Sequence, residues 1–456
     1  MVNLPYQFEN QQILNYVYDS SLYALKTSAQ LNGSTISIDN PSFVAYGDSG
    51  SVDAFGRLRV SNPLTLFDSK QIFYDDALAT STENAPLFYD NAQTAGTGTS
   101  TLFQLAKAQT VLSVATSTIG TRVRQSKMRF NYQPGKSMLI FMTFLMGSTA
   151  PGITKREGLF DANNGLYLEN DGTGYYLVRR TKTSGNVENN RVAQASWNVD
   201  PMDGNGPSGI TIDFTKTQIL VFDLEWLGVG RVRMGFVIDG KIYYVHYFNH
   251  ANVLDVVYMS TPNLPLRSEI SNDGTGLTDN LTQICSTVIS EGGMSDLGVI
   301  RSASTNGSHV DCDAENTIYA ILGMKINSNY VGMHVDILNI ALQIQTASHR
   351  GEWMLLLNPT VADSFSYVRE TNSAIEVARG ATANTVTGGI KFSNGFVESG
   401  GVASGGAGSA DRGISNAIRL GNKIDGTADT LVLCFRPIGG SSNVDVEGMI
   451  TWRELS

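Results

Sequence analysis

The sequence is poor in charge. Charged residues make up 16% of the 456 residues, below the roughly 25% typical of soluble domains. With 42 acidic and 32 basic residues the net charge is −10, so the chain lacks the concentrated positive field that a nucleic-acid binder needs. Few charges combined with 46 glycines suit all-β proteins with many turns, and surfaces that pack into larger assemblies.

Cysteine and long apolar runs are scarce as well. Cys285, Cys312 and Cys434 are odd in number and widely spaced, which argues against a disulfide framework and against a zinc site. The longest apolar run, Met138 to Met146, is far shorter than the roughly 20 residues of a membrane span, and we interpret it as a buried strand. The N-terminus lacks the basic and apolar regions of a signal peptide, so we expect no secretion.

Candidate catalytic residues are few. Asp223 and Glu225 lie two apart on one expected strand, so they share a face at a spacing that could serve glycoside hydrolysis. Alternating acids on a solvent-facing strand are common, and we expect no enzyme. His246 and His250, with Asp255 nearby, could hold a metal only if a turn follows Phe248. Hydrogen-bonding histidines are the simpler interpretation, and we expect no metal and no cofactor.

Glycine-containing motifs give no further site. Asp161 to Gly165, DANNG, echoes a calcium loop, but the distal bidentate acid is not convincingly supplied. Gly228 and Gly230 precede another strand instead of a helix, so they favour a backbone bend over nucleotide binding.

The clearest structural signal is a long β-hairpin over residues 222–248. Asp239-Gly240 fits a two-residue type I′ turn between two runs rich in β-branched and aromatic residues. Strict alternation from that turn predicts an apolar face with the pairs Phe236–Tyr243, Met234–Val245 and Val232–Tyr247. The opposite, mixed face would carry Arg231, Arg233, Gly235, Tyr244, His246 and Phe248, and must meet water or a partner.

These strand signals predict an all-β protein with a lectin-like β-sandwich or jelly roll. Steady strand patterns separated by Gly- and Asn-rich turns begin near residue 131. We expect an N-terminal extended arm at 1–60, a connecting region at 61–130 with short strands, the sandwich at 131–350, and a C-terminal β segment or small second β domain at 351–456.

One stretch carries a resemblance. Asp53 to Lys70, DAFGRLRVSNPLTLFDSK, resembles a segment of structural proteins of tailed bacteriophages and related viruses. The likeness extends to Gln133–Ser137, to the hairpin from Glu225, to Tyr258–Pro265 and to Thr451–Leu455. It implies a virion component of the capsid-decoration, head-fibre or tail-spike type, and it brings no catalytic residues with it.

The expected function is therefore structural. A non-catalytic virion protein would bind major capsid or tail proteins and form a homo-oligomer, with a trimer expected by analogy. Its assembly interface would use Phe55, Arg57, Leu58, Arg59 and Val60, because aromatic residues and arginine are enriched at interface hot spots. An ordinary edge strand is an equal alternative for this segment. The functional alternatives are a carbohydrate-binding adhesion module for a host surface glycan, or a glycan-cleaving tail spike that uses Asp223 and Glu225.

Overall fold

The computed structural model describes residues 62–72, 88–295, 297–330, 332–399 and 420–455 in full, together with the backbone of a few short strands elsewhere. The chain divides into two units, Met1–Asn62 and Pro63–Ser456. In the first unit, short strands pair as β1 (Tyr18–Asp19) with β2 (Ala24–Leu25) and β3 (Ala29–Leu31) with β4 (Ser34–Ile36). The five residues of the expected assembly interface, Phe55 to Val60, lie outside the described residues.

The predicted all-β class is confirmed. The described residues contain no α-helix, only short 3-10 turns at Leu105–Lys107, Gln194–Ser196 and Ser328–Tyr330. Accordingly, the described part of the chain has no helix of the length and apolarity needed to cross a membrane.

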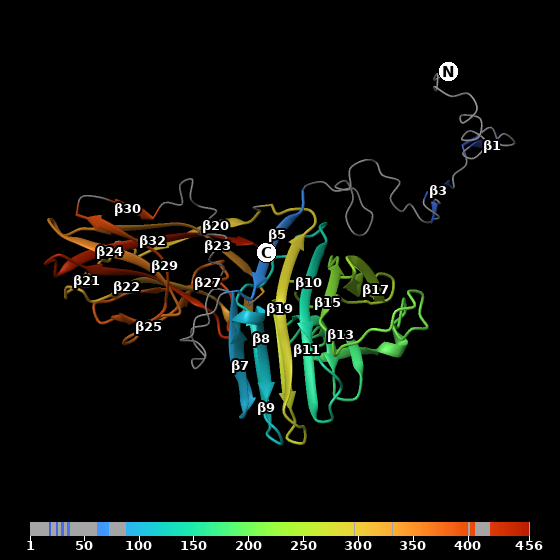
Figure 1. The fold of residues 1–456 in the computed structure, drawn as a ribbon. Helices are drawn as coiled ribbons and strands as arrows, with labels where there is room; N and C mark the ends of the chain where they lie inside the picture. Colours follow the sequence, from blue (N-terminus) through green and yellow to red (C-terminus); the bar gives the residue numbers. More distant parts are fainter. Residues whose placement is uncertain are drawn as a thin grey trace. The chain divides into compact units, whose positions relative to one another are not determined.

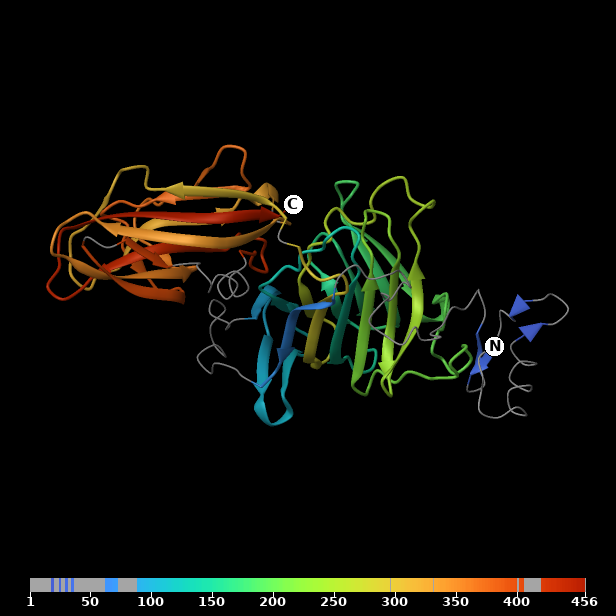
Figure 2. The ribbon, with the colours of Figure 1, turned by 90° about the horizontal axis from the view of Figure 1, so that it is seen from above.

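The first half of the large unit is a β-sandwich of two antiparallel sheets (Figures 1 and 2). The eight-stranded sheet, here called the hairpin sheet, has the order β17 (Lys241–Phe248), β16 (Val232–Ile238), β15 (Gln218–Leu224), β10 (Met138–Leu145), β19 (Asp279–Ser290), β8 (Gln109–Val114) and β7 (Thr99–Gln104), with β5 (Leu64–Lys70) also pairing with β19. The seven-stranded sheet, here called the arginine sheet, has the order β14 (Glu188–Ala193), β13 (Tyr175–Thr181), β12 (Gly165–Asn170), β11 (Ile153–Phe160), β18 (Leu266–Asn272), β9 (Gly120–Ser126) and β6 (Tyr89–Gly96).

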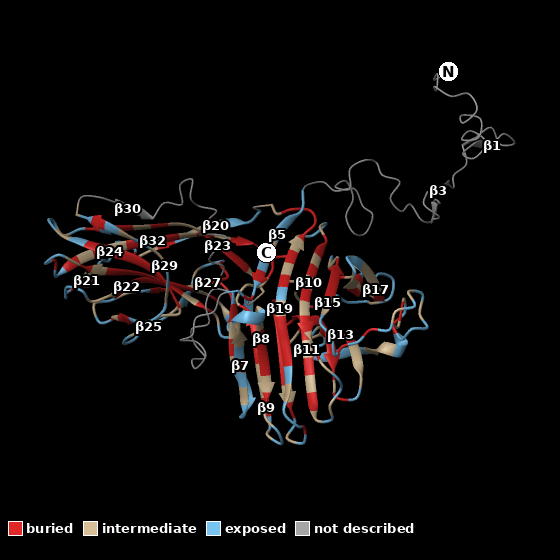
Figure 3. Cartoon of the chain, viewed as in Figure 1, coloured by how far each residue is buried: buried red, intermediate tan, exposed pale blue. Residues whose placement is uncertain are grey.

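Side-chain alternation along the strands builds the core between these sheets. Along β10, every second residue of MLIFMTFL is buried, and Figure 3 shows the resulting alternation of colours. Leu220, Phe222 and Leu224 of β15 pack in the same core as Leu166 and Leu168 of β12. Each such side chain stabilises the fold by roughly 1.5–3 kcal/mol relative to exposure. The Met138–Met146 run is therefore a strand that buries one face, as expected.

The second half of the unit forms another pair of sheets. One contains β20 (Val299–Ser304), β32 (Val444–Leu455), β23 (His334–Ile344) and β30 (Val402–Gly405), with β21 (Val310–Cys312) also on β32. The other contains β26 (Val368–Arg369), β27 (Ile375–Arg379), β22 (Tyr319–Ile326), β31 (Thr430–Pro437), β24 (Arg350–Leu357) and β29 (Ile390–Glu398), and β25 (Thr360–Val361) pairs separately with β28 (Val386–Thr387). Trp452, Ile337 and Leu433 belong to its core.

The sheets differ in extent from the expected domains. Residues 61–130, expected to be a connecting region, supply β5 to β9, and both sheets of the first sandwich include some of these strands. Residues 299–350, expected within the first sandwich, supply β20 to β23 to the second pair of sheets. The cause is strand order: β5 and β8 both pair with β19, at least 165 residues further along the chain, and local sequence patterns do not encode such distant partners.

The hairpin turn is confirmed, but its predicted register is partly wrong. Asp239 and Gly240 both have positive φ, at 50° and 77°, and Phe236 pairs with Tyr243 as expected. A β-bulge between Met234 and Gly235 then shifts the pairing by one residue. Met234 therefore faces His246 and Val232 faces Phe248. The bulge turns His246 and Phe248 away from the mixed face and places Tyr247 on it, opposite Arg233.

Candidate functional site

The predicted acid pair is not an open catalytic site. Asp223 lies on the outer face of β15 with no exposed surface, and it accepts hydrogen bonds from Arg233 Nη2 at 2.5 Å and from Tyr244 Oη at 2.6 Å. Burial raises the pKa of Asp223 to about 6, although Arg233 and Tyr244 oppose the shift. Glu225 follows the end of β15 and is half-buried. With Asp223 enclosed, these two acids do not face one cleft together.

The two histidines of the hairpin region are both hydrogen-bonded inside the sandwich. His246 Nδ1 accepts the backbone N–H of Asn198 at 3.2 Å, and His250 Nδ1 lies 2.5 Å from the carbonyl oxygen of Gly230. The His250 ring stacks on Tyr258 with centroids 4.0 Å apart. Burial lowers the pKa of each histidine to about 4, so both rings are neutral at physiological pH.

Two of the segments named in the resemblance, Gln133–Ser137 and Tyr258–Pro265, form hydrogen bonds to loops that are distant in the chain. Lys136 Nζ donates to Gln133 Oε1 at 2.7 Å and to Ser295 Oγ at 3.1 Å, which fastens the QPGKS turn to the loop after β19. Asn263, from the TPNLP segment, accepts the N–H of Tyr132 at 2.9 Å and donates to the carbonyl oxygen of Gly332 at 2.7 Å. The second contact joins the two halves of the large unit.

A polar cleft of about 560 Å³ opens beside this junction. Loops of both halves line it: the β11–β12 turn, the end of β13, the loop before β18, the 3-10 turn at Ser328–Tyr330 and the turn before β31. The polar side chains of its lining include those of Arg129, Asp161, Asn163, Asn164, Lys182, Ser260, Thr261, Asn329, Tyr330, Lys423 and Asp425. The cleft is within the size range of ligand sites, but its lining is mostly amide, hydroxyl and charged groups.

The β11–β12 turn forms one wall of the cleft and is held by several hydrogen bonds and an ion pair. Asp161 Oδ1 accepts the backbone N–H groups of Asn163 and Asn164 at 2.8 and 2.9 Å, and Arg129 Nη1 binds Asp161 Oδ2 at 2.8 Å. The Asn164 side chain donates to Ser260 Oγ at 2.9 Å and accepts the Ser260 N–H at 3.0 Å. Both carboxylate oxygens of Asp161, the first residue of the motif that resembles a calcium loop, therefore have partners within the turn or on Arg129.

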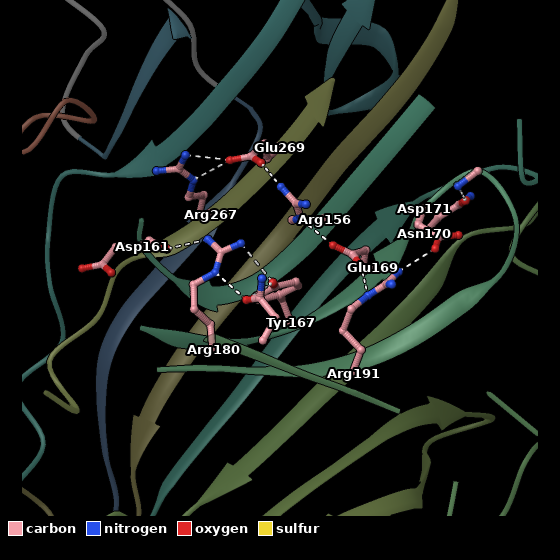
Figure 4. Close-up of polar contacts among 12 residues, drawn as sticks. Arg156, Asp161, Tyr167, Glu169, Asn170, Asp171, Arg180, Arg191, Arg267 and Glu269 are labelled. Atoms are coloured by element: carbon pink, nitrogen blue, oxygen red, sulfur yellow. Dashed lines mark hydrogen bonds and ion pairs between the residues drawn. The ribbon is translucent and has the colours of Figure 1, made fainter. Parts of the chain in front are cut away.

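Behind this wall, a ladder of ion pairs crosses the outer face of the arginine sheet (Figure 4). It runs through Arg267, Glu269, Arg156, Glu169, Arg191 and Asp171, with N···O distances from 2.5 to 2.7 Å. Burial raises the pKa of Glu269, but Arg267 and Arg156 outweigh burial and leave that pKa below its usual value. Glu269 is therefore ionised at neutral pH, and its carboxylate pairs with two arginines.

Arg180 connects the ladder face to the cleft. Its guanidinium donates to the carbonyl oxygen of Asp161 and to Tyr167 Oη, both at 3.0 Å, as Figure 4 shows. The Tyr167 side chain is fully buried, and its ring packs at a tilt against Phe160 with the centroids 4.6 Å apart. The cleft wall thus rests on packed strands, which keeps the positions of its polar groups fixed before a ligand arrives.

The sequence alone does not predict this cleft. The motif Asp161 to Gly165 and the segment Tyr258–Pro265 both contribute to it, but nothing in the chain links these residues to Tyr330 or Lys423. The only local signal is the cluster of amide side chains at the β11–β12 turn.

Comparisons with known proteins concern the fold. No protein-family model matches the chain, and no curated protein does. Solved structures similar to it include a Bacillus licheniformis β-glucanase (10% identity, 48% of this chain and 96% of that chain, TM-score 0.29) and the Bacteroides ovatus family 16 glycoside hydrolase in complex with a glucan product (9%, 49% and 99%, 0.32). The carbohydrate-recognition domain of Emp46p is a third (10%, 49% and 99%, 0.26). At TM-scores this low the likeness carries no argument about fold or activity, and the β-sandwich assignment rests on the sheet order of this chain.

Proposed function

We propose that this protein binds glycans in the polar cleft without cleaving them. The single observation that carries the proposal is the polar lining of the cleft, part of which is held by hydrogen bonds within the β11–β12 turn. A sugar presents several hydroxyl groups that each donate and accept hydrogen bonds, so its site needs closely spaced donors and acceptors. Asn163, Asn329, Ser260 and Thr261 supply such groups, and Tyr330 adds a ring for the apolar face of a sugar.

The acids of the cleft support binding over hydrolysis. Glycoside hydrolysis requires a carboxylic acid that stays protonated near neutral pH. Burial raises the pKa of Asp161, but Arg129 and the two N–H groups outweigh burial and leave its pKa lowered. Hydrogen bonds from Thr427 lower the pKa of Asp425. Both carboxylates are therefore ionised and already engaged, and neither suits the role of proton donor.

A glycan microarray with the full chain tests the proposal. We expect wild-type protein to bind a defined subset of glycans, and Tyr330→Ala and Asn163→Ala each to weaken binding by about tenfold, or roughly 1.4 kcal/mol. Tyr247→Ala and Asn249→Ala are the matched controls outside the cleft and should bind as wild type does. An array without hits, or equal effects of cleft and control variants, would refute the glycan site.

The second candidate is a place on a phage particle. We propose a capsid-decoration, head-fibre or tail component that forms a homotrimer, the state expected by analogy. The observation that favours it is the division of the chain into Met1–Asn62 and Pro63–Ser456, with the virus-like segment Asp53–Lys70 spanning the boundary. Glycan binding would then be the task of the large unit, and docking that of the small one.

Removal of Met1–Asn62 tests this candidate. We expect the truncated protein to keep the β-sheet circular dichroism and melting temperature of the large unit, because the described cores lie in Pro63–Ser456, but to be absent from purified particles. Normal incorporation of the truncated chain would contradict the docking role.

A further inference from the structure

The lining of the cleft contains more basic than acidic residues. Three basic residues, Arg129, Lys182 and Lys423, and two acidic residues, Asp161 and Asp425, line it, which leaves one formal positive charge. The whole chain carries a net charge of −10. A local excess of positive charge in a negative protein favours a ligand that brings a negative charge of its own.

Arg129 and Asp161 neutralise one another. Their ion pair measures 2.8 Å, and their side chains are only 10% and 12% exposed. Asp425 is committed to its own turn, where Thr427 donates its N–H and its hydroxyl to Oδ1. Neither acid is therefore placed to take up a lysine ammonium group fully.

Lys182 and Lys423 are the two remaining charged residues of the cleft lining. Both are exposed, and within the described part of the chain neither takes part in an ion pair. Lys423 is close enough to Asp425 and to the buried Asp429 to act on the pKa of both carboxyls, so its charge is partly offset. The cleft thus holds two ammonium groups beside amide and hydroxyl groups.

The backbone of each lysine is fixed by a tight turn. The carbonyl oxygen of Lys182 accepts the N–H of Gly185 at 3.1 Å, and Lys423 donates its N–H to the carbonyl oxygen of Thr427 at 2.8 Å. Only the flexible side chains need to be ordered when a ligand binds, which limits the entropic cost of using them.

We infer that the cleft selects acidic sugars, with Lys182 and Lys423 as the groups that receive a carboxylate of a uronate or sialate residue. This inference rests on the proposed glycan site and names its ligand class. A single formal positive charge suits one carboxylate per site, and it is too little for a polyanion such as nucleic acid, which needs many neutralised phosphates. The amide and hydroxyl groups of the lining would bind the sugar hydroxyls.

Matched pairs of oligosaccharides test the inference with the full chain: sialyllactose against lactose, and oligogalacturonate against its methyl ester. At low ionic strength we expect wild type to prefer an acidic member by about tenfold, and this preference should shrink in 0.5 M NaCl because exposed charges are screened. Lys182→Gln and Lys423→Gln should each lower the ratio of acidic-sugar to neutral-sugar affinity about threefold or more. Lys216→Gln, an exposed lysine outside the cleft, is the control.

The outcomes separate the inference from the function it rests on. Equal binding of acidic and neutral sugars, lost in Tyr330→Ala and unaffected by the lysine variants, would overturn acid selection and leave the glycan site standing. An equal loss in Lys216→Gln would also overturn it, because the effect would then be that of overall charge. Binding of neither member of any pair would overturn the inference together with the glycan site.

Discussion

Asp223 on β15 and Arg233 on β16 are cross-strand partners, and their side chains form an ion pair 2.5 Å long around a carboxylate with no exposed surface. Tyr244, on the next strand, donates its hydroxyl to the same carboxylate. Three strands of the hairpin sheet are therefore joined by one acid, which makes the role of Asp223 structural.

Replacing Asp223 with Ala should destabilise the fold. The change leaves Arg233 and the Tyr244 hydroxyl without this buried acceptor, and loss of one partner of a buried pair costs about 3–5 kcal/mol. We expect a loss near the lower end, since Arg233 is 13% exposed and water can reach it. Denaturant unfolding followed by circular dichroism measures the change. A loss no larger than that of the exposed Lys216→Ala control would contradict this role.

Glu157 should make the fold less stable as pH rises. It is fully buried on β11, and burial raises its pKa to about 8, with Ser268 and Arg124 opposing. Between the unfolded pKa near 4.5 and the folded pKa near 8, the native state holds a proton that the unfolded state has lost. The stabilisation is complete below pH 4.5 and is lost as pH rises through 8.

Glu157→Gln should remove this dependence. The shift corresponds to an upper bound of about 5 kcal/mol between the two limits. We expect the variant to be more stable than wild type at pH 8 and to show a shallower fall in unfolding free energy between pH 5 and pH 8. Unfolding titrations at several pH values measure both quantities, and parallel curves for the two proteins would contradict the assignment.

His250 should make the fold less stable as pH falls, whereas Glu157 makes it less stable as pH rises. Burial lowers its pKa to about 4, so between pH 6.5 and pH 4 the unfolded state binds a proton that the native state does not. Stability is lost as pH falls through that window. His250→Phe keeps a ring against Tyr258 and should reduce the acid loss by up to about 3 kcal/mol. An unchanged slope of unfolding free energy against pH would contradict the prediction.

Gly240→Val should weaken the hairpin. Gly240 has φ of 77° at the second position of the two-residue turn, and a β-branched residue there costs roughly 1–2 kcal/mol. No atom lies within 4 Å of a Cβ placed on Gly240, so the cost comes from the backbone and not from crowding. Gly240→Asn, which tolerates positive φ, should cost less. Equal melting temperatures for all three proteins would contradict the turn assignment.

The sequence predicted those parts of the hairpin that depend on neighbouring residues. Asp239-Gly240 sets the turn, and the first pair beyond it, Phe236–Tyr243, follows from alternation. The bulge was not predictable, because an inserted residue leaves no mark in a two-residue period. His246 and Phe248 were therefore assigned to the wrong face, and Tyr247 was missed as a neighbour of Arg233.

The cleft depends on contacts that are distant in the chain. Asn164 meets Ser260 across 96 residues, and Asn263 meets Gly332 across 69. Turn chemistry predicts that Asn163 and Asn164 lie in a loop, but the order of strands decides which loops come together. Similarly, Asp223 and Glu225 share a face by alternation, while the enclosure of Asp223 by Arg233 and Tyr244 is a property of the assembled sheet.

Binding without cleavage is the central claim, and one experiment measures both halves of it. The full chain is incubated with a recognised oligosaccharide, and mass spectrometry follows the retained fraction and the length of the sugar. We predict retention on the protein, loss of that retention in Tyr330→Ala, and a sugar of unchanged length after prolonged incubation. Shortened products that disappear in Asp223→Asn, or a sugar that is never retained, would contradict the account.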